Sequence, residues 1–273
     1  MKELENLFKK LDKPNWFNYN DCSYLTTMGS HVFGTSNNDS DYDFYGFIFA
    51  PIELTFPHTQ GEILGFGRNI QRFEQVQYDH LPFKNTTTDI TIYNIVKYFH
   101  LVMMGNPNMV DSLFVPEECI VFQDRVASMV RNNRRIFLSQ KSLHTFKGMM
   151  MAHLSRLKSN HTKEGRLDLE RKYGYDVKDG YHSLRMMLEL EQILYTGDLD
   201  LRSHSNILNQ VRNGEIEKDW LINECEMKLW LFERNQDKFV VPHSPDEDKI
   251  KRLLVNCLEE HFGNLSKYSY NIL

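Results

Sequence analysis

The sequence lacks the long hydrophobic runs that cross membranes, and it contains few cysteines. No stretch approaches the roughly 18 consecutive apolar residues of a transmembrane helix, because polar residues interrupt even the apolar segment 92–104. The four cysteines are far apart, and no two of them form a CxxC pair. This spacing excludes the usual zinc-ribbon and disulfide-framework patterns. We therefore expect no membrane span, reduced thiols and a cytoplasmic location.

The sequence also lacks low-complexity tracts and any excess of basic residues. Its 273 residues are 41% hydrophobic and 12% aromatic, which is enough apolar material to build a sizeable core. The net charge of −5 argues against a protein whose whole surface binds nucleic acid nonspecifically, although it is compatible with a local basic groove. The length predicts one large domain or two closely packed ones.

The first half of the chain contains two stretches that favour buried β-strands. Residues 23–28 are compatible with a strand and stop at Gly29-Ser30. Residues 41–50 are rich in aromatic and β-branched side chains and stop at Pro51. A polar stretch rich in Gly, Ser and Asn separates the two runs. We therefore predict two core strands joined by an irregular connection.

Four further segments complete the expected first half. Residues 1–20 begin with a short amphipathic helix, and residues 52–83 have the weak periodicity of a loop or hairpin insertion. Residues 89–92 resume an extended pattern, and residues 93–104 have helical apolar spacing. A strand followed by a helix is therefore expected after the insertion.

The second half of the chain has helical patterns. A second helix is expected over 179–195, with Gly197 just past its end. In the last helix, Ser244 is the expected N-cap and Pro245 occupies the first turn. An earlier helix shows apolar residues at positions that share one face, namely Phe146, Met150, Leu154 and Leu157.

Asp41 and Asp43 are the first candidates for chemistry. They flank Tyr42 on a predicted strand, whose period of two places both carboxylates on one face, about 7 Å apart along the backbone. Neighbouring carboxylates resist joint ionisation unless a cation compensates them, and all-oxygen ligation suits Mg²⁺. The alternative is a solvated strand edge or an Asx-turn.

Two other features strengthen the metal interpretation. Gly29-Ser30 lies eleven residues upstream of Asp41, where a strand enters a turn. The glycine permits close approach of a phosphate, and the serine hydroxyl and nearby N–H groups can donate to it. Asp89 opens a later strand and could complete the metal site or accept a proton from an attacking hydroxyl. The alternative for Asp89 is an N-cap of the following helix.

Lys178, His182 and Arg185 follow at i, i+4 and i+7 near the start of a predicted helix. They share one helical face, and the free N–H groups of a helix N-terminus also favour anions. We assign Lys178 and Arg185 to phosphate charge, with His182 as a weaker nucleotide-binding partner. The alternative is a solvated helix face.

These residues carry a resemblance to a known superfamily. The segment GSHVFGTSNNDSDYDFYG resembles the motif of polymerase-β-like nucleotidyltransferases: a hydrophobic residue, Gly-Ser, a spacer, Asp-x-Asp and a third acid on a later strand. Met28, Gly29-Ser30, Asp41-x-Asp43 and Asp89 fill those places. Asp89 is preferred to Asp79 as third acid because it begins the matching strand and helix. The segments SDYDFYGFIFAP, TDITIYNIVKYFHLVMMGNP and YGYDVKDGYHSLRMMLELEQILYTGDLDL are similar to a bacterial and phage branch, the YcgL-like predicted nucleotidyltransferases.

The resemblance implies an α+β fold. Residues 1–123 would form a nucleotidyltransferase core with a mixed sheet and helices, and residues 124–273 an all-helical domain that closes over the nucleotide. The implied activity moves a nucleoside monophosphate from a nucleoside triphosphate, such as ATP, to an acceptor hydroxyl and releases pyrophosphate. Asp41, Asp43 and Asp89 would be catalytic and hold two Mg²⁺ ions, for which Mn²⁺ could substitute. An RNA 3′ end, a protein and a small molecule all remain open as acceptors.

Two other classes of function remain open. A noncatalytic nucleotide sensor or regulatory partner would keep the pocket without transferring anything. A structural or interaction protein would not be stabilised by magnesium and a triphosphate.

Overall fold

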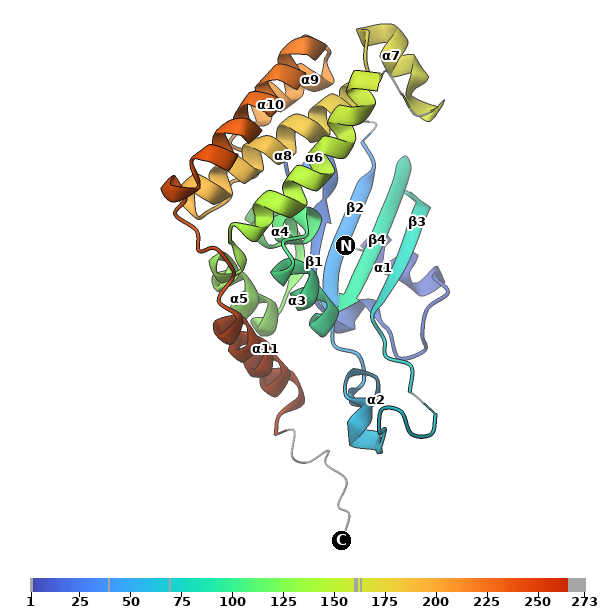
Figure 1. Cartoon of the computed structure of the whole chain (residues 1–273). Coiled ribbons are helices and arrows are strands. Elements are labelled where there is room, and N and C mark those ends of the chain that lie inside the picture. Colours follow the sequence, from blue (N-terminus) through green and yellow to red (C-terminus); the bar gives the residue numbers. More distant parts are fainter. Residues whose placement is uncertain (1, 39, 69, 160–161, 163, 265–273) are drawn as a thin grey trace.

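The computed structural model describes residues 2–38, 40–68, 70–159, 162 and 164–264. Its strands form one mixed sheet that helices cover (Figure 1). The strand order is β3-β4-β2-β1-β5, in which β2 and β4 pair in parallel and the other neighbours pair antiparallel. The strands are β1 (Cys22–Met28), β2 (Tyr42–Ile48), β3 (Gln75–Phe83), β4 (Thr86–Asn94) and β5 (Ile120–Gln123).

The helices begin and end at recognisable signals. The Asn94 side chain caps α3 by accepting from the N–H of Val96, and Asp176 caps α8 in the same way. Gly197 ends α8 in the left-handed conformation that glycine adopts without strain. The helices are α1 (Lys2–Lys10), α2 (Ile52–Thr55), α3 (Ile95–Met103), α4 (Pro107–Phe114), α5 (Arg125–Asn132), α6 (Lys141–Ser159), α7 (Leu167–Tyr173), α8 (Val177–Thr196), α9 (Ser205–Arg212), α10 (Lys218–Arg234) and α11 (Glu247–Phe262).

The two faces of the sheet belong to two different hydrophobic clusters. Alternate residues of β1, β2 and β4 pack against α1, as Leu25, Phe44 and Ile90 do with Leu4 and Phe8. The opposite face packs against the large helical cluster, because side chains of a strand alternate between its faces. Asp43 and Asp89 point to this second, helix-covered face.

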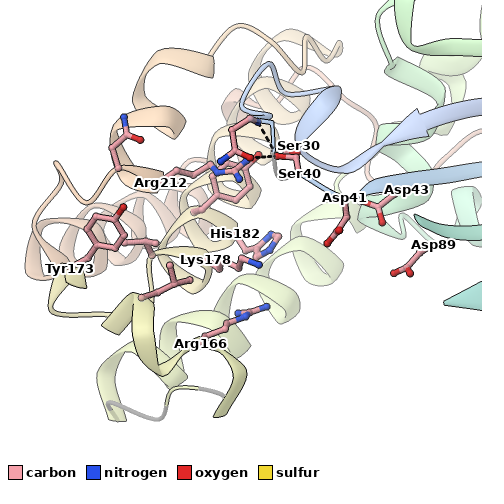
Figure 2. Close-up of a pocket in the computed structure, with 15 residues that line it drawn as sticks. Ser30, Ser40, Asp41, Asp43, Asp89, Arg166, Tyr173, Lys178, His182 and Arg212 are labelled. Carbon is pink, nitrogen blue, oxygen red and sulfur yellow. Dashed lines mark hydrogen bonds between the residues drawn. The ribbon is translucent and has the colours of Figure 1, made fainter. Parts of the chain in front are cut away.

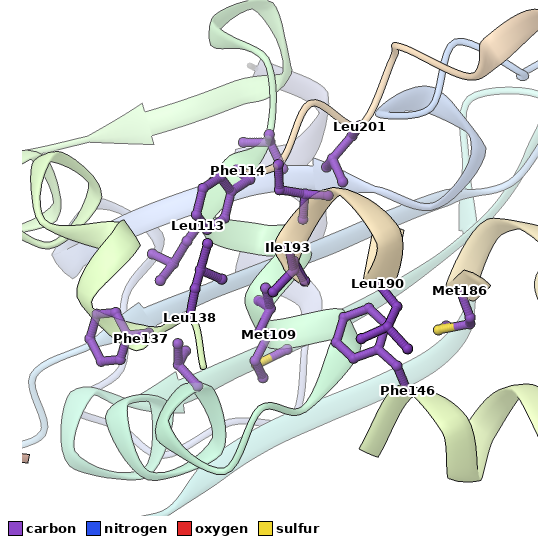
Figure 3. Close-up of a cluster of buried hydrophobic side chains, with 14 of the residues drawn as sticks. Met109, Leu113, Phe114, Phe137, Leu138, Phe146, Met186, Leu190, Ile193 and Leu201 are labelled. Carbon is purple, nitrogen blue, oxygen red and sulfur yellow. The ribbon is translucent and has the colours of Figure 1, made fainter. Parts of the chain in front are cut away.

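One continuous core joins the sheet to the helices of the second half. Met109 and Leu113 of α4 pack with Phe146 of α6 and with Leu190 and Ile193 of α8 (Figure 3). Such burial contributes roughly 1.5–3 kcal/mol for each large apolar side chain. The α8 helix is therefore held firmly against the sheet, and this fixes where its N-terminal turn lies. The division of the chain at residue 123, where β5 ends, stays a prediction.

The structure confirms the α+β class and the main expected elements, and it corrects one local prediction, the cap of the last helix. Of the loop and the hairpin expected in residues 52–83, the hairpin is confirmed for the last part, where β3 pairs antiparallel with β4 at the edge of the sheet. The apolar residues of β3, namely Val76, Tyr78, Leu81 and Phe83, pack on one hydrophobic cluster. The irregular pairing between Tyr78 and Leu81 breaks their period of two, which explains why the sequence pattern was weak. The last helix starts at Glu247, and its cap is Asp246 rather than Ser244. Within the described ranges, no helix is both long and apolar enough to span a bilayer.

Candidate active site

A cavity of about 700 Å³ lies where β1 ends and β2 begins, between the sheet and the helices α7 to α9 (Figure 2). Acidic side chains from the sheet line one side of this cavity, which we call the acidic wall: Asp41, Asp43 and Asp89. Basic side chains from the helical half line the other side, which we call the basic wall: Arg166, Lys178 and Arg212. Tertiary packing thus brings opposite charges to face each other across one space.

Asp43 lies at the centre of the acidic wall. It is the second residue of β2, and the parallel pairing with β4 places it directly opposite Asp89. Side chains directly opposite each other in neighbouring strands share a face. Burial, followed by the negative charges of Asp89 and Asp41, raises the pKa of Asp43 from 3.8 to about 6. The ionised form of Asp43 is therefore disfavoured by its burial and by its two acidic neighbours.

Asp41 is exposed and precedes β2 by one residue. Its Oδ1 atom accepts hydrogen bonds from the hydroxyls of Thr86 and Thr87, each at 2.7 Å. These hydrogen bonds lower the pKa of Asp41, and the positive charge of Lys178 lowers it further. Asp41 is therefore an ionised carboxylate whose orientation is held by the start of β4.

Asp89 lies inside β4 and not at a helix start. Because Asn94 caps α3, the alternative that Asp89 is an N-cap is wrong. Its Oδ1 atom accepts a hydrogen bond of 2.7 Å from the backbone N–H of His80. In the described part of the chain, no three His, Cys, Asp or Glu side chains are grouped closely enough to hold a metal ion. Asp41 and Asp89 each have an oxygen engaged by neighbouring residues.

Gly29 is required by the geometry of Asp43. Its φ of +65° lies in the left-handed region, where residues with a Cβ atom are strained. A Cβ atom on Gly29 would also lie 2.1 Å from Oδ2 of Asp43, which is far closer than van der Waals contact allows. The following residue, Ser30, lines the cavity. The Gly-Ser turn thus makes room for the carboxylate as well as bordering the cavity.

The turn that follows β1 is held by the helical half of the chain. The hydroxyls of Tyr181 and Thr35 lie 3.0 Å apart, and the guanidinium of Arg212 donates to the backbone oxygen of Thr35. The side-chain amide of Asn209 donates to the backbone oxygen of Gly34 at 3.3 Å. The Gly-Ser turn is therefore anchored to α8 and α9.

Lys178 and His182 both line the cavity, as their shared helical face predicted. Lys178 lies in the first turn of α8 and is exposed. Burial and the nearby charge of Arg185 lower the pKa of His182 well below its ordinary value of 6.5. His182 is therefore neutral at physiological pH and offers a hydrogen bond rather than a charge.

Arg185 lies deeper than a solvated helix face would place it. Its Nη1 atom is 2.7 Å from Asp111 and 3.2 Å from Glu189, and its guanidinium stacks 4.5 Å from the ring centre of Phe33. It is buried and lines a smaller cavity of about 170 Å³ that Gly29 and Asp43 also border. Asp111 and Glu189 already engage its guanidinium, so its expected contact with phosphate stays a prediction.

Several residues that line the cavity were not predicted from the sequence. Arg212 ends α9 and Arg166 precedes α7, where Nη1 of Arg166 also lies 3.3 Å from Asp176. Neither arginine belongs to a motif, because only the folding of distant helices brings them to the same cavity. Asn37, Ser40, Tyr173, Tyr181 and Asn213 complete the missed polar and aromatic lining.

A strand, a Gly-Ser turn and an Asp-x-Asp strand beside a third acidic strand form the core arrangement expected of polymerase-β-like nucleotidyltransferases. The chain belongs to the RNA repair pathway DNA polymerase beta family, whose sequence model matches residues 5–236. This match confirms the superfamily that the motif predicted.

Two individual proteins show weaker similarity. An uncharacterized 38.9 kDa protein of Enterobacteria phage T4 is 29% identical over 114 residues, which cover 40% of this chain and 31% of the phage protein. The crystal structure of a nucleotidyltransferase-like protein from Exiguobacterium sibiricum has 10% sequence identity and a TM-score of 0.29, covering 80% of this chain and 70% of that one. The chain thus spans about a third of the length of the phage relative.

Proposed function

We propose that this protein transfers a nucleoside monophosphate from a nucleoside triphosphate to an acceptor hydroxyl and releases pyrophosphate. The observation that carries the proposal is the pairing of an acidic and a basic wall across one cavity. A triphosphate needs positive charge around its oxygens, and the reaction needs divalent cations held by carboxylates. One cavity offers both requirements at once.

The donor atoms of the acidic wall suit a pair of Mg²⁺ ions, for which Mn²⁺ could substitute, although the described carboxylates are not grouped as a ready metal site. Its donors are carboxylate oxygens, which hard divalent cations prefer. Burial raises the pKa of Asp43, and the negative charges of Asp89 and Asp41 raise it further; a cation would offset that repulsion. Asp41, Asp43 and Asp89 would hold the ions, which supply charge neutralisation at the phosphates and activation of the acceptor hydroxyl.

The side chains of this chain position the substrates. Ser30 and the adjacent turn would orient the leaving phosphates, and Lys178 with Arg212 would neutralise their charge. His182 would donate a hydrogen bond in its neutral form. Arg185 would act indirectly on this wall. Its guanidinium stacks on the ring of Phe33, which lies in the turn that α8 and α9 anchor.

The transfer is a single displacement at the α-phosphorus. The acceptor oxygen forms a bond to the α-phosphorus, and the bond from that phosphorus to the bridging oxygen of the leaving pyrophosphate breaks. The proton of the acceptor hydroxyl passes to Asp89 or to bulk water. Because such reactions depend mainly on positioning and charge, the carboxylates should matter far more than any single surface lysine.

We propose RNA as the acceptor. The description of the family names an RNA repair pathway, and an RNA 3′ end carries the hydroxyl that the reaction needs. A protein hydroxyl and a small molecule remain outcomes of the test. The free thiols of the buried cysteines suit a cytoplasmic location, which stays a prediction.

The test is incubation with each α-labelled nucleoside triphosphate, Mg²⁺ and a cell extract, followed by separation of RNA, protein and small metabolites. We expect label in RNA and release of pyrophosphate. Asp41→Asn and Asp43→Asn should abolish both without unfolding the chain, whereas Asp248→Asn, an exposed acid on α11, should leave both intact. Undiminished turnover in both site variants would reject the proposal, and nucleotide binding without turnover would indicate the sensor.

A further inference from the structure

The third acid of the acidic wall lies opposite a β-bulge in the neighbouring edge strand. The pairing of β3 with β4 is irregular between Tyr78 and Leu81, so Asp79 and His80 both stand opposite Asp89. An extra residue of this kind locally disrupts the ladder and re-aims the groups next to it. Bulges are frequent beside active sites for this reason. The irregularity therefore coincides with a residue of the proposed metal site.

His80 has a strained backbone that its own side chain does not explain. Its φ of +56° lies in the left-handed region, which is unfavourable for a residue with a Cβ atom. Its side chain is 83% exposed, so packing of the ring does not hold the residue there. Strain that persists without packing to compensate it is typical of functional positions.

The compensating contact is made by the backbone of His80. Its N–H donates to Oδ1 of Asp89 at 2.7 Å, which is short enough for a charge-assisted hydrogen bond. A regular antiparallel strand directs its amides to the backbone oxygens of its partner or away from it, and not to a side chain. The imidazole lies farther off, with Nδ1 at 3.8 Å from the same oxygen, which is too long for a hydrogen bond. The backbone amide is thus the group that holds Asp89.

We propose that the bulge at His80 is a positioning device for the third carboxylate. By binding Oδ1 of Asp89, the His80 amide fixes the rotation of the carboxylate, so that the other oxygen is presented to the cavity and to Asp43. Asp89 gains from this support because 39% of its side chain is exposed, so packing restrains its rotation less than it would restrain a buried carboxylate. The inference rests on the proposed function, since it concerns the same metal site.

The backbone role predicts an unusual pattern among substitutions. His80→Gly keeps the N–H and adopts a positive φ easily, whereas His80→Pro removes the N–H and cannot adopt that φ. Partners that orient metal ligands typically contribute about 10- to 100-fold in metal affinity. We therefore expect His80→Pro to raise the Kd for Mn²⁺ at least about tenfold, and His80→Gly to keep it within about twofold of the parent protein.

The experiment measures Mn²⁺ binding to the whole chain by electron paramagnetic resonance of free Mn²⁺, without nucleotide and without turnover. Asp89→Asn is combined with His80→Pro in a double-mutant cycle, and the two effects should be strongly non-additive if the amide acts through Asp89. An unchanged Mn²⁺ Kd in His80→Pro, or a loss in His80→Gly as large as in His80→Pro, would overturn the inference.

A second measurement covers the case in which proline disrupts the edge strand. Amide hydrogen exchange of His80 in the unmodified chain, followed by NMR, should be slow despite the exposure of the residue, and Asp89→Ala should accelerate it. Fast exchange in the unmodified chain contradicts the inference. If Asp43→Asn and Asp89→Asn leave Mn²⁺ binding unchanged, the proposed function fails as well; if they weaken it and the His80 results fail, this inference alone is wrong.

Discussion

Replacing Gly29 by alanine tests whether the Gly-Ser turn exists to accommodate Asp43. The added Cβ atom would meet Oδ2 of Asp43 at 2.1 Å and would sit at a φ of +65°. The left-handed conformation costs an alanine about 1–2 kcal/mol, and turning Asp43 away from its rotamer costs about 0.5–1.5 kcal/mol more. We therefore expect a loss of about 1.5–3.5 kcal/mol in the free energy of unfolding.

Turnover should fall more steeply than stability. A displacement of about 1 Å in a catalytic group can lower the rate about 100-fold. The carboxylate of Asp43 must move by about 1 Å or more to relieve the clash with the added Cβ atom. The assay is pyrophosphate release at saturating triphosphate and Mg²⁺, on protein shown to be folded by circular dichroism at the assay temperature.

Gly61 provides the control for backbone strain. It is in the left-handed conformation, with φ of 80° and ψ of 15°, and a Cβ atom there would have nothing within 4 Å. Gly61→Ala therefore carries backbone strain without a clash, at a residue that does not line the cavity. If Gly29→Ala kept as much turnover as Gly61→Ala, the proposed clash with Asp43 would be refuted.

Three further outcomes follow from the electrostatics of the site. Because the pKa of Asp43 is raised from 3.8 to about 6, the metal-free folded state keeps a proton that the unfolded chain releases, so stability is lost as pH rises through that window. In EDTA, Asp43→Asn should therefore match the parent protein near pH 4 and exceed its stability above pH 7 by about 1–3 kcal/mol in urea titrations; equal stability at both pH values would contradict the raised pKa. Lys178→Ala should raise the KM for the triphosphate severalfold and make that KM less dependent on salt concentration. Replacing the exposed Lys251 by alanine should change neither. Identical KM values in the two variants would exclude Lys178 from the phosphate site. Arg185→Ala leaves two buried carboxylates without their partner and should cost about 3–5 kcal/mol, against under about 1 kcal/mol for the exposed Arg171→Ala; similar unfolding midpoints would show that the buried ion pairs contribute little.

Local signals in the sequence were sufficient for the elements that carry the acids. The aromatic and β-branched run that includes Asp43 forms a buried strand, because such side chains pack well on a pleated sheet. The helix expected to end before Gly197 does end there. The strand β3 was not predicted because its bulge between Tyr78 and Leu81 interrupts the alternation of the apolar residues that pack on the core. The predicted cap at Ser244 failed because Asp246, two residues later, also has a capping side chain and makes the bond.

The sequence by itself determined the identity of the acids, the glycine beside them and the strands on which they lie, since period, turn chemistry and motif are properties of neighbouring residues. Tertiary structure alone brought Arg166 and Arg212 beside Lys178 and set the depth of Arg185. Arg166, Lys178 and Arg212 come from three separate helical segments, and their convergence depends on how the shared core seats α8 against the sheet. Arg185 shares a helical face with Lys178, yet it pairs with Asp111 of α4 and borders a smaller cavity than the one that Lys178 lines. Helical period predicts which side chains share a face, but only the neighbouring elements determine which part of that face remains open to a substrate.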